Sequence, residues 1–411
     1  MPSFTADQAV AFRLARQRLG IDRSAEAFAL RVDTRSAKAS ASTDSAKALA
    51  SPRSAKALAE RVAERVVDVV GAAGGIQAQV MSAAETSIWT RRPSTTRVEI
   101  RDALWQKRDV VRTSAMRLTL HLVPARDFAI YIAALKPMSM ATLQRWHNRV
   151  GAKPGEIRAL IDTVVESLRD DGPQTQQELI ARAKKRAGRG VRAWFDHAWS
   201  AVRPAVIDGA ILYGPPRGAE ATFVDAEAWL GPQPRVSVDD ARAELLRRFL
   251  SAFGPASPHD FAKWSGLKTS EARSVLAALE HDVVEVAVDD ARGWMLRSDV
   301  AALAGSSLDA TAVRLLPAFD AFLLAHATKD HLVEPRFYKR VYRAQGWISP
   351  TVLEGGRIVG VWFQKAAGRE ITLDIQLFRR ARPGVRDAIA AEAAAVGAFL
   401  GVRCTPRFTS T

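Results

Sequence analysis

Two glutamines, Gln77 and Gln79, have the residue type and spacing in this chain that best suit a chemical role. They follow two consecutive glycines, Gly74 and Gly75. In a helix, side chains two residues apart diverge by about 200°, whereas in an extended segment they point the same way. The glycines permit an extended approach, so both amides can face one point. Two neutral amides offer enough donors and acceptors to orient one water molecule.

An amide pair is a poor general base, so the reaction that it assists must have a leaving group that departs easily. Holding a nucleophile in position can still contribute several kcal/mol toward reaction. A purine alkylated at N7 or N3 is such a leaving group, because its ring is cationic and its glycosidic bond breaks through an oxocarbenium-like sugar. Spacing alone does not decide the matter, since two such glutamines are more often surface or capping residues.

The elements predicted around the glutamines are three helices followed by a hairpin. Apolar periodicity, a helix-ending glycine cluster and a cap at Thr95 and Thr96 mark these boundaries. The predicted helices cover 60–72, 80–90 and 97–107, and the predicted strands cover 109–113 and 117–122. This order of elements is typical of a winged helix.

The same order recurs twice farther along the chain. The second set has predicted helices over 155–170, from Thr175 onward and over 193–207, then strands over 211–213 and 221–224. The third has helices over 238–252, 258–264 and 270–280, then a hairpin that turns at Asp289 and Asp290. Ser257 followed by Pro258 is a helix-start signal, and Thr269 with Ser270 is another expected cap.

We therefore predict an α+β chain with three tandem winged-helix domains followed by a C-terminal β-barrel-like domain. The predicted domains cover 1–140, 141–235, 236–305 and 306–411. A helix is expected over 7–30, and residues 34–59 repeat Ser-Ala-Lys-Ala units that predict a mobile basic insertion. The last domain combines a hairpin over 349–365, an alternating strand over 371–377 and a closing helix over 384–400.

The charge balance favours a nucleic-acid partner. The 411 residues include 59 Lys and Arg against 44 Asp and Glu, which gives a formal net charge of +15. Such a chain is attracted to polyanions, although a generally basic enzyme would have the same balance. The single cysteine, Cys404, excludes internal disulfides and cysteine metal clusters. No membrane-length apolar run or signal peptide is apparent, so we expect a cytoplasmic, nucleoid-associated protein without metal or cofactor.

Four blocks of sequence resemble the AlkZ/YcaQ-type DNA glycosylase family, in the family's order. They are 75–79 (GIQAQ), 118–124 (LTLHLVP), 315–320 (LLPAFD), and 346–353 (GWISPTVL) followed by 356–362 (GRIVGVW). The resemblance implies three winged helices, a β-barrel and a Gln-x-Gln motif typical of the AlkZ-like branch. It implies that Gln77 and Gln79 position the attacking water. Members of that branch excise bulky alkylpurines, some unhook interstrand crosslinks, and some confer self-resistance to alkylating natural products.

Several cations are candidate contacts to the implied partner, double-stranded DNA with alkylated bases. The predicted DNA-binding residues are Arg91, Arg92, Arg336, Lys339, Arg340, Arg343 and Lys365. The run from Arg336 to Arg343 mixes cations with aromatic rings, which suits phosphates near a distorted duplex. It is equally typical of an amphipathic helix with Phe337 and Val341 turned inward. We expect an open cleft and a monomer.

Two other classes of function remain open at this point. A winged-helix regulator would read base edges without catalysis, although no dimerisation segment or effector domain is apparent. A damage-binding protein would bind lesions tightly and release no base. Neither requires the glutamine pair.

Overall fold

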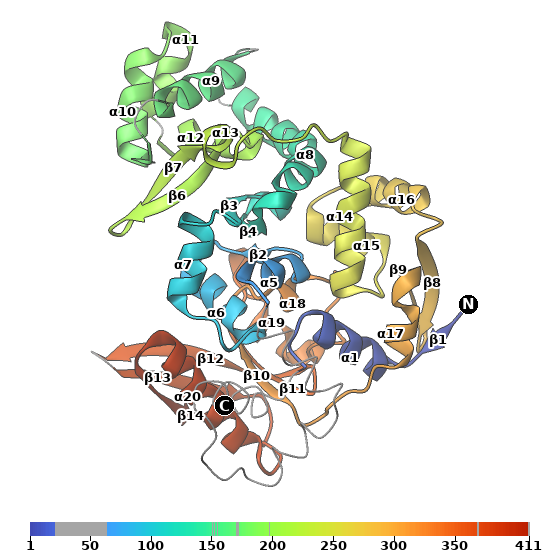
Figure 1. Ribbon diagram of the computed structural model, residues 1–411. Helices are drawn as coiled ribbons and strands as arrows, with labels where there is room; N and C mark the ends of the chain where they lie inside the picture. The colour runs from blue at the N-terminus through green and yellow to red at the C-terminus, as the bar shows by residue number, and fades with distance from the viewer. Residues whose placement is uncertain are drawn as a thin grey trace.

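The computed structural model describes residues 1–20, 64–149, 151, 153, 155–169, 172–196, 198–367 and 370–409. The predicted insertion over 34–59 and the second part of the helix predicted over 7–30 lie outside the described residues. The described chain has a mixed α+β fold with three sheets. In Figure 1, the segment that carries the glutamines lies centrally, between the third helix-hairpin unit and the C-terminal sheet.

The first unit has the predicted order of three helices and a hairpin. Its elements are α5 (Val66–Ala72), β2 (Ile76–Gln77), α6 (Met81–Arg91), α7 (Arg97–Trp105), β3 (Val110–Ser114) and β4 (Leu120–Pro124). Thr96 caps α7 by accepting a hydrogen bond from the Glu99 amide, as predicted. The additional short strand β2 pairs antiparallel with β4. The extended approach to the glutamines is thereby confirmed for Gln77.

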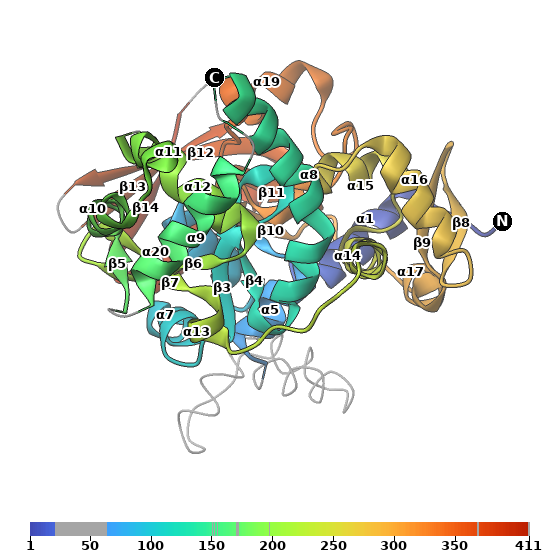
Figure 2. The same cartoon turned by 90° about the horizontal axis from the view of Figure 1, so that it is seen from above.

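The second unit continues the sheet of the first. Its elements are α9 (Glu156–Leu168), β5 (Gln174–Thr175), α10 (Gln176–Arg186), α11 (Arg189–Arg192), α12 (Ala198–Asp208), β6 (Ile211–Arg217), β7 (Glu220–Asp225) and α13 (Ala226–Leu230). The strands form one six-stranded sheet in the order β2-β4-β3-β6-β7-β5. Between the two units runs the 22-residue helix α8 (Phe128–Arg149), which is not among the predicted elements. Figure 2 shows α8 crossing between the second unit and α14.

The third unit shares a core with the first. Its elements are α14 (Val238–Phe253), α15 (Pro258–Ser265), α16 (Thr269–Ala278), β8 (Val283–Val288), β9 (Ala291–Leu296) and α17 (Val300–Ala304). Leu245, Phe249 and Phe253 recur every fourth residue on α14 and are buried together with Val70 and Ile88 of the first unit. This common core fixes the third unit against the glutamine segment.

The N-terminal residues lie against the third unit. Strand β1 (Ser3–Phe4) pairs in parallel with β8. Helix α1 (Ala6–Arg16) places Ala9 and Phe12 in a cluster with Val286 and Met295. The prediction that this helix extends to residue 30 is wrong, because it ends at Arg16.

The C-terminal segment is one five-stranded sheet covered by a helix. Its elements are β10 (Val313–Leu316), α18 (Ala321–Leu324), α19 (Tyr338–Val341), β11 (Thr351–Glu354), β12 (Arg357–Ala367), β13 (Glu370–Leu377), α20 (Val385–Leu400) and β14 (Arg403–Phe408). The order is β10-β11-β12-β13-β14, with the last pair parallel. In the described residues the sheet keeps two edges, so closure into a barrel is not observed. Ile389 and Ala393 of α20 cover it.

Candidate active site

The glutamines follow a tight turn that only glycine fits easily. Gly74 and Gly75 have φ values of 67° and 89°. A Cβ on Gly75 would lie 3.2 Å from Cε of Met116 and 3.4 Å from the Leu122 carbonyl oxygen. This turn leads from α5 directly into β2, where Gln77 pairs with His121. The glycines thus bring the glutamine segment alongside β4.

Both glutamine side chains contact the end of the β3–β4 hairpin, where the turn leads into β4. Oε1 of Gln77 accepts a hydrogen bond from Nη2 of Arg117, and Oε1 of Gln79 accepts one from the Leu120 backbone amide, each at 3.3 Å. The Ala78 amide between them donates to the Leu120 carbonyl at 2.7 Å. Gln77 is buried and Gln79 is exposed. The two glutamines therefore lie on one short segment that passes from the protein interior to the surface.

Arg117 connects this turn to the third unit. Arg117 and Leu118 have φ values of 55° and 59°, a left-handed conformation that costs free energy in residues with a Cβ. Nη1 of Arg117 donates to the backbone carbonyl of Trp264 in α15. Burial lowers the pKa of Arg117 to about 10, so its guanidinium is charged at neutral pH. The Gln77 amide oxygen thus bonds to a fixed cation.

His121, opposite Gln77 in the strand pair, is held neutral. Burial, and then the nearby charge of Arg117, lower the pKa of His121 to about 3. Its Nδ1 lies 3.0 Å from the Thr119 carbonyl oxygen. At neutral pH this imidazole carries no extra proton, so it is not a general acid. The groups bonded to the two glutamine oxygens are a guanidinium and a backbone amide, neither of which is a base.

Lys329 is a second buried basic residue near Arg117. Burial, followed by the charge of Arg117, lowers the pKa of Lys329 to about 7. Its Nζ donates to the His326 carbonyl oxygen and lies 5.4 Å from the ring centroid of Tyr342. Neither Arg117 nor Lys329 stands out in the sequence. The two are 212 positions apart in the numbering, and no local spacing connects them.

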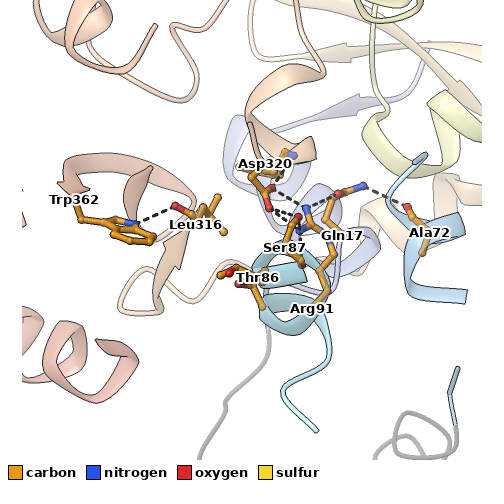
Figure 3. Close-up of polar contacts among 10 residues, drawn as sticks. Gln17, Ala72, Thr86, Ser87, Arg91, Leu316, Asp320 and Trp362 are labelled. Carbon is orange, nitrogen blue, oxygen red and sulfur yellow. Dashed lines mark hydrogen bonds and ion pairs between the residues drawn. The ribbon is translucent and has the colours of Figure 1, made fainter. Parts of the chain in front are cut away.

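Arg91 is not available to DNA, so its predicted role as a DNA contact is wrong. Its side chain and that of Asp320 are both 0% exposed, and they form a bidentate ion pair of 2.7 and 2.8 Å. Arg91 also donates to Ser87 and to Oε1 of Gln17 (Figure 3). Asp320 caps α18 by accepting from the Phe322 amide at 3.0 Å. The sequence does not show this burial, because it arises from tertiary structure: helix α6 directs Arg91 toward the C-terminal segment.

The remaining predicted DNA contacts lie nearer the surface. Arg92 donates to Glu99 at 2.6 Å and is largely covered. Lys365 pairs with Asp374 at 2.8 Å but is 67% exposed. Nη2 of Arg340 donates to Oε1 of Gln376 at 3.1 Å. In the run from Arg336 to Arg343, the other three predicted contacts are exposed, namely Arg336, Lys339 and Arg343.

The apolar residues of the same run turn inward, as the amphipathic interpretation predicted. Val341 is fully buried, and the Phe337 ring stacks on Phe378 with centroids 4.6 Å apart. The segment therefore has one buried apolar side and one cationic side. Within the described residues, no group of three potential ligands could hold a metal ion, and no helix is long and apolar enough to cross a membrane.

Comparison with known proteins identifies the class. The sequence profile of the DNA glycosylase AlkZ-like family matches residues 70–399, and the chain belongs to this family. A Streptomyces sahachiroi protein described as an interstrand DNA cross-link repair glycosylase is 31% identical over 308 residues, which cover 72% of this chain and 81% of that protein. The solved structure of Streptomyces sahachiroi DNA glycosylase AlkZ has a TM-score of 0.79 and 25% identity, with 100% of both chains covered.

These relationships establish the protein as a DNA glycosylase with the mixed α+β fold of AlkZ. Of the classes considered from the sequence, the enzyme is therefore favoured over the regulator and the damage-binding protein.

Proposed function

We propose that this glycosylase hydrolyses the N-glycosidic bond of alkylated purines in double-stranded DNA, with Gln77 and Gln79 positioning the water. One observation carries the proposal: both amide oxygens bond to the same short segment, Arg117–Leu120, at the border between interior and solvent. Protein donors fix each amide through its oxygen. The rest of each amide group can then orient a water molecule beside the sugar.

The chemistry fits a cationic leaving group. As the C1′–N bond breaks, its electron pair passes to the alkylated purine, which leaves as a neutral base. The oxygen of the positioned water bonds to C1′, and its proton is released to solvent. His121, whose pKa is lowered to about 3, is too weak a base to assist, and Arg117 beside Gln77 is cationic. A substrate that departs without strong base assistance is thus the one this site suits.

The proposed substrates are bulky N7-alkylguanine adducts, including interstrand crosslinks. The exposure of Gln79 supports this choice, since the water site borders solvent and a bulky or tethered base need not enter a deep pocket. The Streptomyces relative described as a cross-link repair glycosylase supports it further. The biological role would be repair of alkylation damage or self-resistance to a DNA-alkylating natural product.

DNA would be held by three tandem winged-helix domains and a C-terminal barrel-like domain, with the boundaries given above. The threefold recurrence of helices followed by a hairpin supports this assignment. The proposed phosphate contacts are Arg92, Arg336, Lys339, Arg340, Arg343 and Lys365. A monomer binding one lesion at a time suffices for this reaction, and no cofactor takes part.

The test is excision from defined duplexes. We would incubate the protein with DNA containing N7-methylguanine, a bulky N7-alkylguanine or an N7-guanine crosslink, and then cleave abasic sites with alkali. The expected result is strand breaks at the lesion, absent from the unmodified duplex, and conversion of the crosslinked duplex to separable strands. If the protein binds all three duplexes stably but produces strand breaks at none of the three lesions, the proposal is refuted.

A further inference from the structure

Two large aromatic side chains are exposed in the same stretch of the C-terminal segment. Tyr338 is 42% exposed and Trp347 is 44% exposed. Among the described residues, the other large hydrophobic side chains with comparable exposure are aliphatic and lie elsewhere in the sequence. Large rings left in solvent commonly mark a contact surface.

Each exposed ring rests on another ring that is more buried. Tyr338 stacks on Tyr342, with centroids 4.9 Å apart and an interplanar angle of 27°. The hydroxyl of Tyr342 donates to the Leu323 carbonyl at 3.0 Å. Trp347 meets Phe319 edge to face, with centroids 4.9 Å apart and an angle of 78°. Each exposed ring is thus held in place by its contact with a more buried ring.

The backbone that carries Trp347 is also fixed. The Arg343 amide donates to the Trp347 carbonyl at 2.8 Å, and the Ser349 amide donates to the Val341 carbonyl at 2.9 Å. An isolated bridge joins Tyr342 to Ile348. A ring presented in one fixed arrangement loses little conformational entropy when it binds a flat ligand.

This aromatic surface borders the glutamine segment. Val80, which directly follows Gln79, packs against the hydrophobic cluster that contains Phe319, Val341 and Ile348. Lys329, whose pKa is lowered by burial and then by the charge of Arg117, lies over the ring of Tyr342. The hydrophobic cluster that includes Phe319, beneath Trp347, therefore contacts the residue that follows Gln79.

The cations beside the rings identify the chemistry of the partner. Arg336, Lys339 and Arg343 are exposed within the same stretch. Arg336 pairs with Glu334, whereas Lys339 and Arg343 form no ion pair with any other described residue. Aromatic rings beside unpaired cations suit unpaired nucleotides, because the rings stack on bases while the cations contact phosphates.

We propose that Tyr338 and Trp347 form a stacking surface for a nucleobase displaced from the duplex beside the excision site. This proposal deepens the function proposed above and depends on it for its location next to the lesion. The rings bind unpaired bases in preference to paired ones, while the cations bind either form of DNA. It stabilises the distorted DNA in which Gln77 and Gln79 reach the glycosidic bond.

The experiment compares two undamaged duplexes that differ in one unpaired base. Binding of the full-length protein is measured by fluorescence anisotropy with a fully paired duplex and with one that carries a single bulged base. The variants are W347A, Y338A and W347F, with V98A as a matched control on α7, where Val98 is 75% exposed. A charge variant, K339A/R343A, probes the cations. Thermal unfolding midpoints verify that each variant is folded.

We expect wild type and V98A to prefer the bulged duplex. W347A should weaken binding to the bulged duplex by roughly 5- to 150-fold and leave the paired duplex nearly unchanged, as expected for the loss of base stacking. Y338A should act in the same direction, and W347F should retain the preference. K339A/R343A should weaken both duplexes alike and flatten the salt dependence.

Equal loss by W347A on both duplexes, or no loss on either, would overturn the stacking surface. So would a W347F variant that behaves as W347A does. Because these duplexes contain no lesion, the binding result is independent of the result of the excision assay. A protein that excises alkylpurines but shows no preference for the bulge refutes this inference alone.

Discussion

Arg91 and Asp320 form a buried bidentate ion pair that joins helix α6 to the C-terminal segment. Gln17 extends the contact, since its Oε1 accepts from Arg91 and its Nε2 donates to the carbonyls of Ala72 and Ala252. Helix α6 begins two residues after Gln79. The network therefore attaches the helix that follows the glutamines to α1, to α5, to α14 and to the start of α18.

The first prediction concerns this ion pair. Burial by itself would raise the pKa of Asp320, but the charge and hydrogen bonds of Arg91, together with the hydrogen bonds from Ser87 and the Phe322 amide, lower the net pKa. Asp320→Asn leaves the guanidinium buried without its counter-ion, which should lower the free energy of unfolding by about 3–5 kcal/mol. Urea denaturation measures this loss.

A double variant serves as the control for the ion pair. Arg91→Met with Asp320→Leu removes both charges and should recover much of the lost stability, because no buried charge is then unpaired. A double variant that loses as much stability as the sum of Arg91→Met alone and Asp320→Leu alone would show that the pair contributes no coupling.

Gly75→Ala is the second test. The positive φ of Gly75 and the 3.2 Å approach of Met116 mean that a methyl group forces both strain and a shift. We expect destabilisation of about 1–2 kcal/mol from the conformation alone. We also expect a fall in excision rate, because the turn sets where β2 begins. Gly151→Ala is a control, since φ is also positive there but an added Cβ would meet no other described residue within 4 Å. Equal excision rates for the two variants would contradict this account of the turn.

Arg117→Met should slow excision more than it weakens DNA binding. The substitution removes the donor to Oε1 of Gln77 and the tie to the Trp264 carbonyl. The Gln77 amide is then free to rotate, and part of the orientation of the water is lost. Single-turnover rates, with Kd for the same duplex, separate the two effects. A variant whose Kd rises with an unchanged rate at saturation would mean that Arg117 serves binding instead.

The stability of the protein should rise with pH above neutrality. The pKa of Lys329 falls from 10.5 to about 7 on folding. Between these values the unfolded chain binds more protons than the native one, so the free energy of unfolding increases with pH, by up to about 1.4 kcal/mol per unit. Lys329→Met should remove this slope between pH 7 and 9, whereas the exposed control Lys339→Met should keep it. Urea titrations that give parallel slopes for wild type and Lys329→Met would exclude the assignment.

Local signals in the sequence predicted most elements well. Ser257 followed by Pro258 begins α15 as expected, and the hairpin of the third unit turns at Asp289, whose φ is 47°. The cap expected at Thr269 is displaced by one residue, because Lys268 is the N-cap of α16. The sequence pattern does not predict helix α8, because the helix contains Pro137, which normally interrupts a helical pattern.

The site was only partly predictable. A glycine turn and two glutamines are visible as neighbours in the sequence, and the extended strand follows from them. The burial of Arg91 is set by Asp320, which lies 229 positions away. The proximity of Arg117 to Lys329 likewise exists only in the folded chain, so no sequence period could reveal it.

The most direct measurement is the single-turnover excision rate of Gln77→Ala/Gln79→Ala on a duplex with a defined N7-alkylguanine. Val98→Ala is the control. With affinity for undamaged DNA retained, the double variant should excise roughly 100- to 1000-fold more slowly than wild type, as expected when preorganised polar groups are removed from the reacting centre. Excision at the wild-type rate by the double variant would contradict the central claim that these two amides position the attacking water.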